Sequence, residues 1–443
     1  MKIRDFKNKK VTVVGLGRFG GGIGAARWLA NQGASVTISD RASADDLADS
    51  LAKLDGLGIK FNLGGHIETD FTEADLLVVS PAIAPEMPLL KLARKKKIPI
   101  TTEINLFIER CPAKIVAITG SVGKSTTTAM LGDILSEKFV THVGGNIGKS
   151  LLSDLDTIKQ DHIVVLELSS FQLEYTAEIQ FRPNIALATN IVPNHLDRHG
   201  DMQNYVAAKK NIFRFQTADD LLILNAQDEA FSDWQKQAPS QVQFFSANTK
   251  PKFELLVPGE HNQANAQAAW AAAKSLGVSR QQAQRALSNF SGLKHRLAFV
   301  CESAGFKYFN DSKCTTPEGA IVALDSFPIK KAIILLGGYD KNVSFDKLAK
   351  QANQKAKCVI AFGQVAQKIA CAIKNDLTHN PTQEHSGAFI LVETLEQAVA
   401  EAQKIANPGD SILLSPACAS YDQFTNYEQR GDIFCNLVMQ NKL

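Results

Sequence analysis

The sequence lacks any apolar run that approaches the ~18 residues a membrane-spanning helix needs. The N-terminus, MKIRDFKNKK, is charged and precedes only a short apolar stretch, so no signal peptide is visible. The formal net charge is +3, and the single short basic run, residues 94–97, is typical of a solvated helix end. These absences predict a cytoplasmic protein that binds neither a membrane nor nucleic acid.

Disulfide and zinc signatures are also missing. The seven cysteines are an odd number, and no two of them form a C-x-x-C pair. This spacing argues against a disulfide framework or a zinc site and fits a reducing compartment. What is present is an ordinary globular composition, 45% hydrophobic and 21% charged. The length of 443 residues favours about three domains of ~150 residues each.

The most informative stretch is KIVAITGSVGKSTTT, residues 114–128. Its apolar run, Ile115–Ile118, predicts a buried parallel strand. The residues after it form a candidate phosphate-binding loop that opens a helix, namely Gly120, Ser121, Val122, Gly123, Lys124, Ser125 and Thr126. Glycines there let several backbone N–H groups point at one anion, a lysine reaches the β- and γ-phosphates, and a hydroxyl holds Mg²⁺. The common pattern has one more glycine, at the position of Ile118, so this loop is a variant.

A second glycine loop lies near the N-terminus. A predicted strand, Lys10–Val14, runs into G-x-G-x-x-G at Gly15, Gly17 and Gly20, and a helix follows. The next predicted strand, residues 35–39, ends at Asp40. This context is typical of a dinucleotide fingerprint and indicates a bound diphosphate or nucleotide without saying which. A close-packed strand–helix turn is the alternative.

The pattern of strands and helices predicts an α/β protein of three domains. These are a Rossmann-like domain at residues 1–102, a P-loop ATPase-like central domain with a parallel sheet at 103–292, and a Rossmann-like domain at 293–443. In the central domain, the nearly continuous apolar runs 163–168, 185–189 and 221–224 indicate a sheet buried on both faces. Such sheets bind ligands beyond the carboxyl ends of their strands.

Polar clusters fall at those strand ends. Glu167 follows one strand, and His195 lies in a predicted polar loop, residues 195–200, that precedes a helix capped by Asp201. Both are candidates for a Mg²⁺ site. A carboxylate is the ordinary ligand of magnesium, whereas histidine is a less usual one, and a structural role for His195 is the alternative.

Nine segments in one order resemble the Mur ligases, the ATP-dependent enzymes that build the peptide of bacterial cell-wall precursors. They are TGSVGKSTTT, GGNIG, LELSSFQLE, HLDRHGDMQNYVAAK, GEHNQANAQAA, HRLAFV, NDSKCTTPE, LGGYDKNVSF and LSPACASYDQF. Within the family, NDSKCTTPE and LSPACASYDQF favour the member that adds D-glutamate to UDP-N-acetylmuramoyl-L-alanine. A DNPR-type segment, which marks the diamino-acid-adding member, is not seen.

The resemblance implies a division of labour. The first domain would bind the UDP of the substrate, so that the glycine loop at Gly15 holds UDP and not NAD. The second domain would bind ATP, and the third would close over both and hold the amino acid. ATP would phosphorylate the L-alanine carboxylate, and the amine of D-glutamate would attack the acyl phosphate. A tetrahedral intermediate would then lose phosphate.

The resemblance also implies site residues. Catalysis and metal binding, with two Mg²⁺ ions, would fall to Lys124, Ser125, Glu167, His195 and Lys209, the last carbamylated. ATP would contact the loop Gly120–Thr126 together with Asn265, Arg296, Asp311 and Lys313. The UDP substrate would contact Gly15, Gly17, Gly20, Asp40, Arg41 and Asn146. D-glutamate would be held by Thr315, Lys341, Ser420 and Tyr427. The implied partners are small-molecule substrates only, and we expect a monomer.

Some positions depart from the family pattern. Asn194 stands where an acid is expected, and Tyr427 stands where phenylalanine is more usual. Cys314 and Cys418 lie beside proposed site residues, where buried packing is the commoner role of a thiol.

Other readings stay open. One is a different Mur-type or a folylpolyglutamate-type amide ligase. Another is an NAD-dependent oxidoreductase, against which the second phosphate loop argues, and a third is a P-loop switch or motor that acts on a macromolecule.

Overall fold

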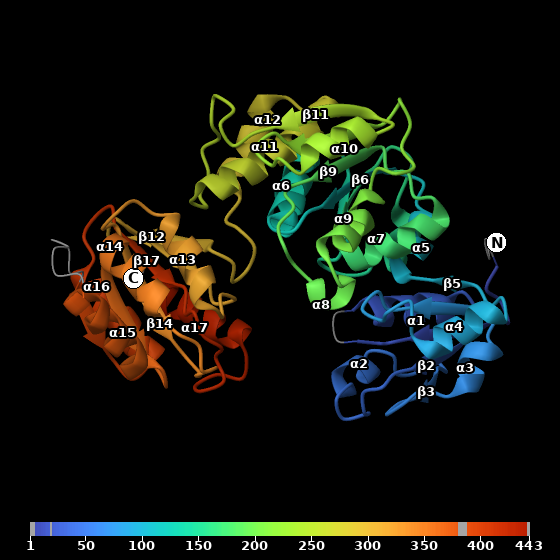
Figure 1. The fold of residues 1–443 in the computed structure, drawn as a ribbon, viewed down its shortest axis with the longest axis horizontal. Helices are drawn as coiled ribbons and strands as arrows, with labels where there is room; N and C mark the ends of the chain where they lie inside the picture. Colours follow the sequence, from blue (N-terminus) through green and yellow to red (C-terminus); the bar gives the residue numbers. More distant parts are fainter. Residues whose placement is uncertain (1–4, 18–19, 380–387, 441–443) are drawn as a thin grey trace. The chain divides into compact units, whose positions relative to one another are not determined.

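The computed structural model describes residues 5–17, 20–379 and 388–440 (Figure 1). The chain forms two compact units, residues 1–251 with 264–283, and residues 252–263 with 284–443. The first unit contains two sheets and the second contains one. The prediction of an α/β fold with three domains is confirmed, while the boundaries at residues 102 and 292 stay predictions.

The N-terminal sheet has five parallel strands in the order β3-β2-β1-β4-β5. The strands are β1 (Lys10–Val14), β2 (Ser35–Ser39), β3 (Lys60–Asn62), β4 (Leu76–Val79) and β5 (Ile100–Thr101). Their helices are α1 (Gly21–Asn31), α2 (Ala48–Ala52), α3 (Glu68–Thr72) and α4 (Pro88–Lys95). The glycine loop at Gly15 therefore lies at the carboxyl end of the central strand β1. Arg18 and Phe19 of the G-x-G-x-x-G motif lie outside the described residues.

The central sheet has six parallel strands in the order β11-β10-β9-β6-β8-β7. They are β6 (Lys114–Thr119), β7 (Thr141–Gly145), β8 (Ile163–Glu167), β9 (Ile185–Ala188), β10 (Leu221–Asn225) and β11 (Gln241–Phe245). The helices are α5 (Glu103–Ile108), α6 (Lys124–Ser136), α7 (Ser170–Thr176), α8 (Leu196–His199), α9 (Met202–Lys210), α10 (Phe231–Gln237), α11 (Glu260–Ser275) and α12 (Arg280–Asn289). Two 3₁₀ turns cover Leu152–Thr157 and Ala177–Ile179.

One prediction about this region is wrong in part. The expected polar loop 195–200 contains the one-turn helix α8, Leu196–His199. Its sequence, HLDRHG, carries little apolar signal, because the turn is held by polar contacts to a neighbouring helix. The capping role predicted for Asp201 is confirmed, since its side chain accepts a hydrogen bond from Asn204 N at 2.8 Å.

The C-terminal sheet has six strands in the order β12-β13-β17-β14-β15-β16, all parallel except β12. They are β12 (Ala298–Ser303), β13 (Phe306–Asn310), β14 (Ala332–Gly337), β15 (Ala356–Phe362), β16 (Ala388–Leu391) and β17 (Ser411–Leu414). The helices are α13 (Pro317–Asp325), α14 (Asp346–Lys355), α15 (Ala366–His379), α16 (Leu395–Ile405) and α17 (Tyr427–Gln440). Alternate residues of β14 enter separate cores on the two faces of the sheet.

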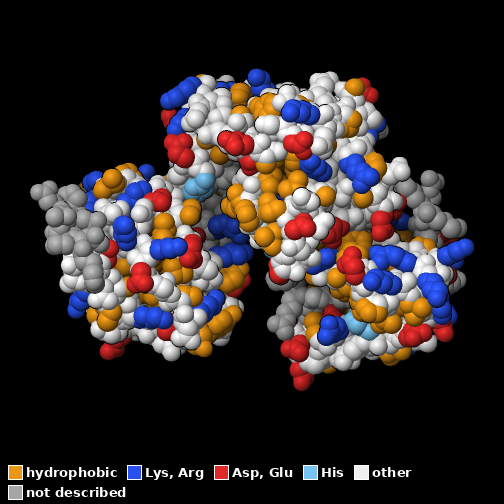
Figure 2. All heavy atoms as spheres, in the orientation of Figure 1, with side chains coloured by type: hydrophobic (Ala, Val, Ile, Leu, Met, Phe, Trp, Pro, Cys, Tyr) orange, Lys and Arg blue, Asp and Glu red, His pale blue; other side chains and the backbone are white. Residues whose placement is uncertain are grey.

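The surface agrees with the small net charge. Lys and Arg side chains are interspersed with Asp and Glu over the face drawn in Figure 2. Among the described residues, no helix is long and apolar enough to cross a membrane.

Candidate functional site

The loop between β6 and α6 is shaped by two glycines with positive φ. Gly120 has φ +146°, and a Cβ there would lie 1.9 Å from Thr189 Oγ1. Gly123 has φ +84°, and a Cβ there would lie 2.5 Å from Asn265 Oδ1. Gly123 is also the N-cap of α6, so the unpaired N–H groups of the first helical turn face the loop. The backbone therefore has the form that binds a phosphate, and it places Asn265 beside the loop.

Residues after the neighbouring strand β9 brace this loop. Val122 N donates to Asn190 Oδ1 at 2.9 Å, and Val122 O accepts from Asn190 Nδ2 at 2.8 Å and from Thr189 Oγ1 at 2.7 Å. Lys124 Nζ donates to Ser121 O at 3.0 Å. Ser125 lies in the first turn of α6 with a half-buried side chain, as does the next residue, Thr126.

Lys209, on α9, is a buried cation below the same loop. It is 1% exposed, and its Nζ donates to Gly120 O at 2.7 Å. Burial and the charge of Lys124 lower the pKa of Lys209 to about 7, while Glu167 acts in the opposite direction. A large share of the amine is therefore neutral near pH 7, which is the form that can react with CO₂.

Glu167 lies at the carboxyl end of β8 and is 1% exposed. Its Oε1 accepts from Asn146 Nδ2 at 2.8 Å, but its Oε2 is buried with no hydrogen-bond partner among the described residues. An unpaired buried carboxylate oxygen is costly, and a divalent cation would satisfy it. Glu167, Lys124 and Lys209 lie close enough for their charges to interact.

His195 stands apart from this group. No hydrogen bond joins its described side chain to Glu167 or Lys209; instead its ring packs on Phe171 at a centroid distance of 5.0 Å. Its backbone N donates to Asn194 Oδ1 at 2.9 Å, so the amide at Asn194 makes a local contact with the N-cap residue of α8.

The residues present fit a magnesium site in which phosphates of a bound nucleotide would supply part of the ligands. Within the described chain, no group of three His, Cys, Asp or Glu side chains could hold a metal alone. Mg²⁺ is usually bound by one or two carboxylates together with substrate phosphates. Glu167 and the hydroxyl of Ser125 match that pattern.

The N-terminal glycine loop is braced by Asp40, the acid that the fingerprint predicts. Asp40 Oδ2 accepts from Leu16 N at 2.7 Å and from Gly17 N at 3.4 Å. The carboxylate thus holds the loop in shape, as Asn190 does in the central domain. Gly20 is the N-cap of α1 with φ +94°, and Arg41 is exposed.

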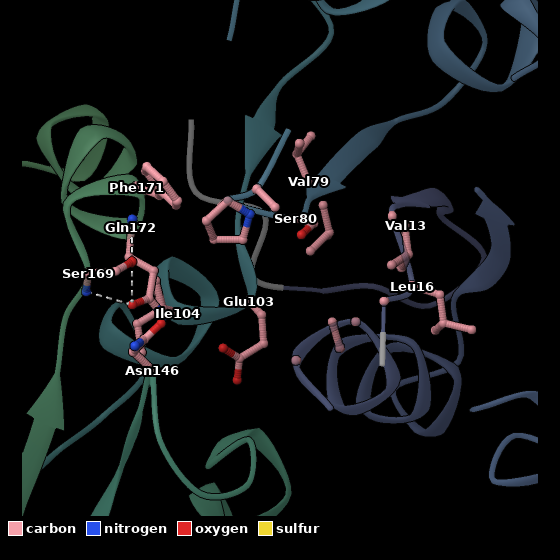
Figure 3. Close-up of a pocket in the computed structure, with 18 of the residues that line it drawn as sticks. Val13, Leu16, Val79, Ser80, Glu103, Ile104, Asn146, Ser169, Phe171 and Gln172 are labelled. Atoms are coloured by element: carbon pink, nitrogen blue, oxygen red, sulfur yellow. Dashed lines mark hydrogen bonds between the residues drawn. The ribbon is translucent and has the colours of Figure 1, made fainter. Parts of the chain in front are cut away.

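A cavity of about 230 Å³ lies beside this loop, between the N-terminal and central sheets (Figure 3). Its lining includes the predicted substrate residues Gly15, Gly17 and Asn146. Glu103, at the start of α5, is the one ionisable residue among the described residues that line it. Burial raises the pKa of Glu103 to about 7, against a hydrogen bond from Ser150 Oγ.

In the second unit, the predicted residues gather at one edge of the C-terminal sheet. Lys313 and Thr315 follow β13, Lys341 follows β14, and Ser420 follows β17. These three strands are neighbours in the sheet, with β17 in the middle. Tyr427 begins α17, and Lys313 Nζ lies 5.4 Å from the centre of its ring.

Asp311 lies at the same edge and is 7% exposed. It accepts from Ser415 Oγ at 2.7 Å and from Leu297 N at 3.0 Å. Burial raises the pKa of Asp311 to about 6, and the charge of Arg296 opposes this shift. The thiols beside it behave as packing groups, since burial raises the pKa of both Cys314 and Cys418 to about 12.

Arg430, a fully buried cation on α17, was not predicted from the sequence. Its guanidinium donates to Ser312 O at 2.8 Å and to Cys418 O at 3.0 Å, which ties together the loops after β13 and β17. The available signal was helical spacing, because Arg430 shares a buried face with Phe434 and Val438.

Comparisons with known proteins match all three parts of the chain. The Mur ligase MurD-like N-terminal domain matches residues 9–102, the Mur ligase middle domain 118–254, and the Mur ligase glutamate ligase domain 295–418. The chain is 41% identical to the UDP-N-acetylmuramoylalanine–D-glutamate ligase of Acidobacterium capsulatum, over 99% of this chain and 98% of that protein. It is 37% identical to the enzyme of the same name from Pelotomaculum thermopropionicum, over 99% of both chains.

Solved structures share the fold. The UDP-N-acetylmuramate–alanine ligase MurC of Thermotoga maritima matches with a TM-score of 0.57 and 22% identity, over 98% of this chain and 100% of that one. A MurF structure from Acinetobacter baumannii matches with a TM-score of 0.58 and 19% identity, over 92% and 91% of the two chains.

Proposed function

Because this chain belongs to the Mur ligase family, we propose that it is the ATP-dependent ligase that joins D-glutamate to UDP-N-acetylmuramoyl-L-alanine. The observation that carries the proposal is 36–41% identity, over almost the whole chain, to enzymes that bear that name. The products would be the D-glutamyl adduct, ADP and phosphate, in the synthesis of peptidoglycan precursors. We further propose that it works in the cytoplasm as a monomer.

The central domain would carry the chemistry. A carboxylate is a poor electrophile at neutral pH, so it must be activated before an amine can attack it. Lys124 would neutralise charge on the transferred phosphoryl group, and the N–H groups of the loop from Gly120 would hold the β-phosphate. Glu167 and Ser125 would hold Mg²⁺, which would supply charge neutralisation on the phosphates. Two ions are proposed, with His195 on the side of the second.

Lys209 would act in carbamylated form. The neutral form of its buried amine would attack CO₂, forming an N–C bond and releasing one proton, so that an anionic carbamate would stand beside Lys124. An anionic carbamate would attract the cations that Glu167 alone cannot hold. The lowered pKa of Lys209 and the unpaired Oε2 of Glu167 support this proposal.

The other two domains would bind the remaining substrates. The cavity at Gly15, Gly17 and Gly20 would take the UDP substrate, with Asp40 and Arg41 near the uracil and Asn146 near the reacting end. The C-terminal edge would hold the carboxylates of D-glutamate through the four residues already named, and nucleotide contacts would come from Asn265, Arg296, Asp311 and Lys313. The proposed domain boundaries stay at residues 1–102, 103–292 and 293–443.

Phosphate release tests the proposal. The purified protein is given ATP, Mg²⁺ and UDP-N-acetylmuramoyl-L-alanine, with D-glutamate, L-glutamate, L-alanine, L-lysine or meso-diaminopimelate as acceptor. We expect release with D-glutamate only. Release with another acceptor would show that the protein is an amide ligase of the family with a different amino-acid specificity. Absence of release with every acceptor would refute the nucleotide substrate and direct the next assay to folate-type acceptors.

A further inference from the structure

A single carboxylate fastens the one-turn helix α8 to helix α7. Glu174, on α7, has Oε2 3.0 Å from Arg198 Nη2 and Oε1 3.2 Å from His199 Nδ1. Both of these partners lie on α8, and the His199 side chain is buried. We call Glu174, Arg198 and His199 the Glu174 clamp. A four-residue helix has no stability of its own, so these contacts decide where α8 lies.

The other ring nitrogen of His199 is also occupied. Nε2 lies 2.9 Å from Ser170 Oγ. A carboxylate only accepts hydrogen bonds, so Nδ1 carries the proton toward Glu174 and Nε2 accepts from the hydroxyl. Ser170, His199 and Glu174 thus follow the order of a hydrolase triad, but Ser170 is 2% exposed, so no substrate reaches it. The array fixes structure and does not supply a nucleophile.

What the clamp fixes is His195, the residue directly before α8. His195 has φ +54° and ψ +33°, a left-handed conformation that is uncommon outside glycine. Such residues are strained and persist only where their surroundings hold them. His199 N donates to His195 O at 3.0 Å, and the Phe171 ring packs against both imidazoles, at 5.0 and 5.4 Å.

The same cluster touches both parts of the site. Phe171 lines the cavity beside the N-terminal glycine loop (Figure 3). On the other side, the His199 ring lies 5.4 Å from that of Tyr205, whose hydroxyl is 2.8 Å from Ser121 Oγ in the phosphate loop. A shift of α8 would therefore move groups that contact both the cavity and the phosphate loop.

We propose that the Glu174 clamp is a positioning device that fixes the backbone at His195, the residue proposed above to serve the second Mg²⁺. This inference rests on the proposed function, because it needs His195 to serve a cation. Histidine is a weak ligand for a hard cation, so its contribution depends on its being held in place before the ion arrives. His195 is exposed, so without the clamp its imidazole would be free to move and would add little.

Glu174→Gln tests the clamp, since it keeps the shape of the side chain and removes its charge. The matched control is Asp220→Asn, which removes another acid that pairs with an arginine in the same unit. Asp220 Oδ2 lies 2.6 Å from Arg182 Nε. Arg182 precedes β9 and Asp220 precedes β10, so this pair lies at the amino ends of the strands, away from the proposed site at their carboxyl ends. The readouts are thermal unfolding, hydrogen exchange over residues 196–200, Mn²⁺ binding to the ADP complex by electron paramagnetic resonance, and steady-state kinetics.

We expect Glu174→Gln to speed exchange over α8, to weaken Mn²⁺ binding by roughly tenfold, and to lower kcat with KM for ATP nearly unchanged. Asp220→Asn should lower the unfolding temperature but leave the other three readouts at wild-type values. Arg198→Gln, which removes one arm of the clamp, should give a smaller change in the same direction and serves if Glu174→Gln does not fold.

Two results would overturn the inference. One is faster exchange over α8 with unchanged Mn²⁺ binding and kcat, and the other is identical behaviour of the clamp and control variants. Wild-type protein that binds Mn²⁺ but ligates no amino acid would instead refute the proposed function. In that case a loss of Mn²⁺ binding in Glu174→Gln would still support the clamp.

Discussion

The two glycine loops of the first unit are built alike and differ in charge. Each follows a central parallel strand, β1 or β6, and each ends in a glycine with positive φ that caps a helix. Each is braced from a neighbouring strand, by Asp40 after β2 and by Asn190 after β9. The backbone solution to holding a phosphate is therefore the same at both loops.

The side chains around them are not the same. The central loop has Lys124 above it, Lys209 buried beneath it and Glu167 beside it. Among the described residues that line the cavity at the N-terminal loop, Glu103 is the one ionisable group. Lys124 and a carboxylate that can hold Mg²⁺ can stabilise charge that develops during phosphoryl transfer. No such pair is found among the described residues that line the N-terminal cavity. The difference assigns chemistry to one loop and recognition to the other.

Removing Lys124 should remove the difference in charge between the two loops, and we expect this change to have the largest effect on turnover. In Lys124→Ala the central loop keeps its backbone but loses its cation, so we expect ATP-dependent turnover to fall about 1,000-fold or more. The matched control is Lys138→Ala, just past the end of the same helix, where the ammonium group donates hydrogen bonds to the carbonyls of residues 276 and 277. Phosphate release measures both variants, and near-normal turnover in Lys124→Ala would refute the assignment of the loop.

Removing Lys209 should have the next largest effect and can be partly reversed. We expect Lys209→Ala to lose about 100-fold in turnover, because the carbamate that would balance Lys124 cannot form. Added short-chain carboxylic acids should restore part of the activity by placing an anion in the vacated space. The assay is phosphate release with and without acetate or formate. Wild-type protein should also lose activity in CO₂-depleted buffer, and full activity there would exclude the carbamate.

These effects concern residues that the sequence could reveal, because their constraints are local. The strands β1, β6, β8, β9 and β10 were predicted because buried parallel strands are continuous apolar runs. The phosphate loop was predicted because glycine spacing and an adjacent lysine specify it within a few residues. The prediction that D-glutamate is the amino acid came from the resemblance to the family and not from the physical chemistry of the residues.

Other parts could not be predicted, for a physical reason. The strands β7 and β11 at the edges of the central sheet are only partly buried and contain glycine or glutamine, so their apolar signal is weak. The Glu174 clamp and the hydrogen bonds from Arg430 to backbone carbonyls depend on which segments lie side by side, and that is a tertiary property. The bracing role of Asp40 likewise depends on β2 being the neighbour of β1.

Asp40 and Asn190, which hold the two loops in shape, can be tested as a pair, and we expect smaller effects on turnover than for the two lysines. Asp40→Asn weakens the hydrogen bonds to Leu16 and Gly17, so we expect KM for the UDP substrate to rise about tenfold with KM for ATP unchanged. Asn190→Ala removes the bonds to Val122 and should raise KM for ATP with KM for the UDP substrate unchanged. Steady-state kinetics with each substrate varied in turn measures both. A rise in the same KM for both variants would show that the loops do not serve separate ligands.

The smallest expected effect concerns Glu103 and sharpens the contrast in charge. Burial raises the pKa of this carboxyl to about 7, so it is neutral below that pH and ionised above it. An ionised carboxylate would repel the diphosphate of a substrate in the same cavity, so KM for the UDP substrate should rise about threefold as pH increases through 7. Glu103→Gln stays neutral at every pH and should remove this rise. Its control is Glu109→Gln, at the other end of α5 and outside the cavity lining, which should keep the wild-type profile. A pH profile of KM that is equally steep in Glu103→Gln would place the titrating group elsewhere. It would mean that binding at the N-terminal loop depends on a charge outside the described lining of its cavity.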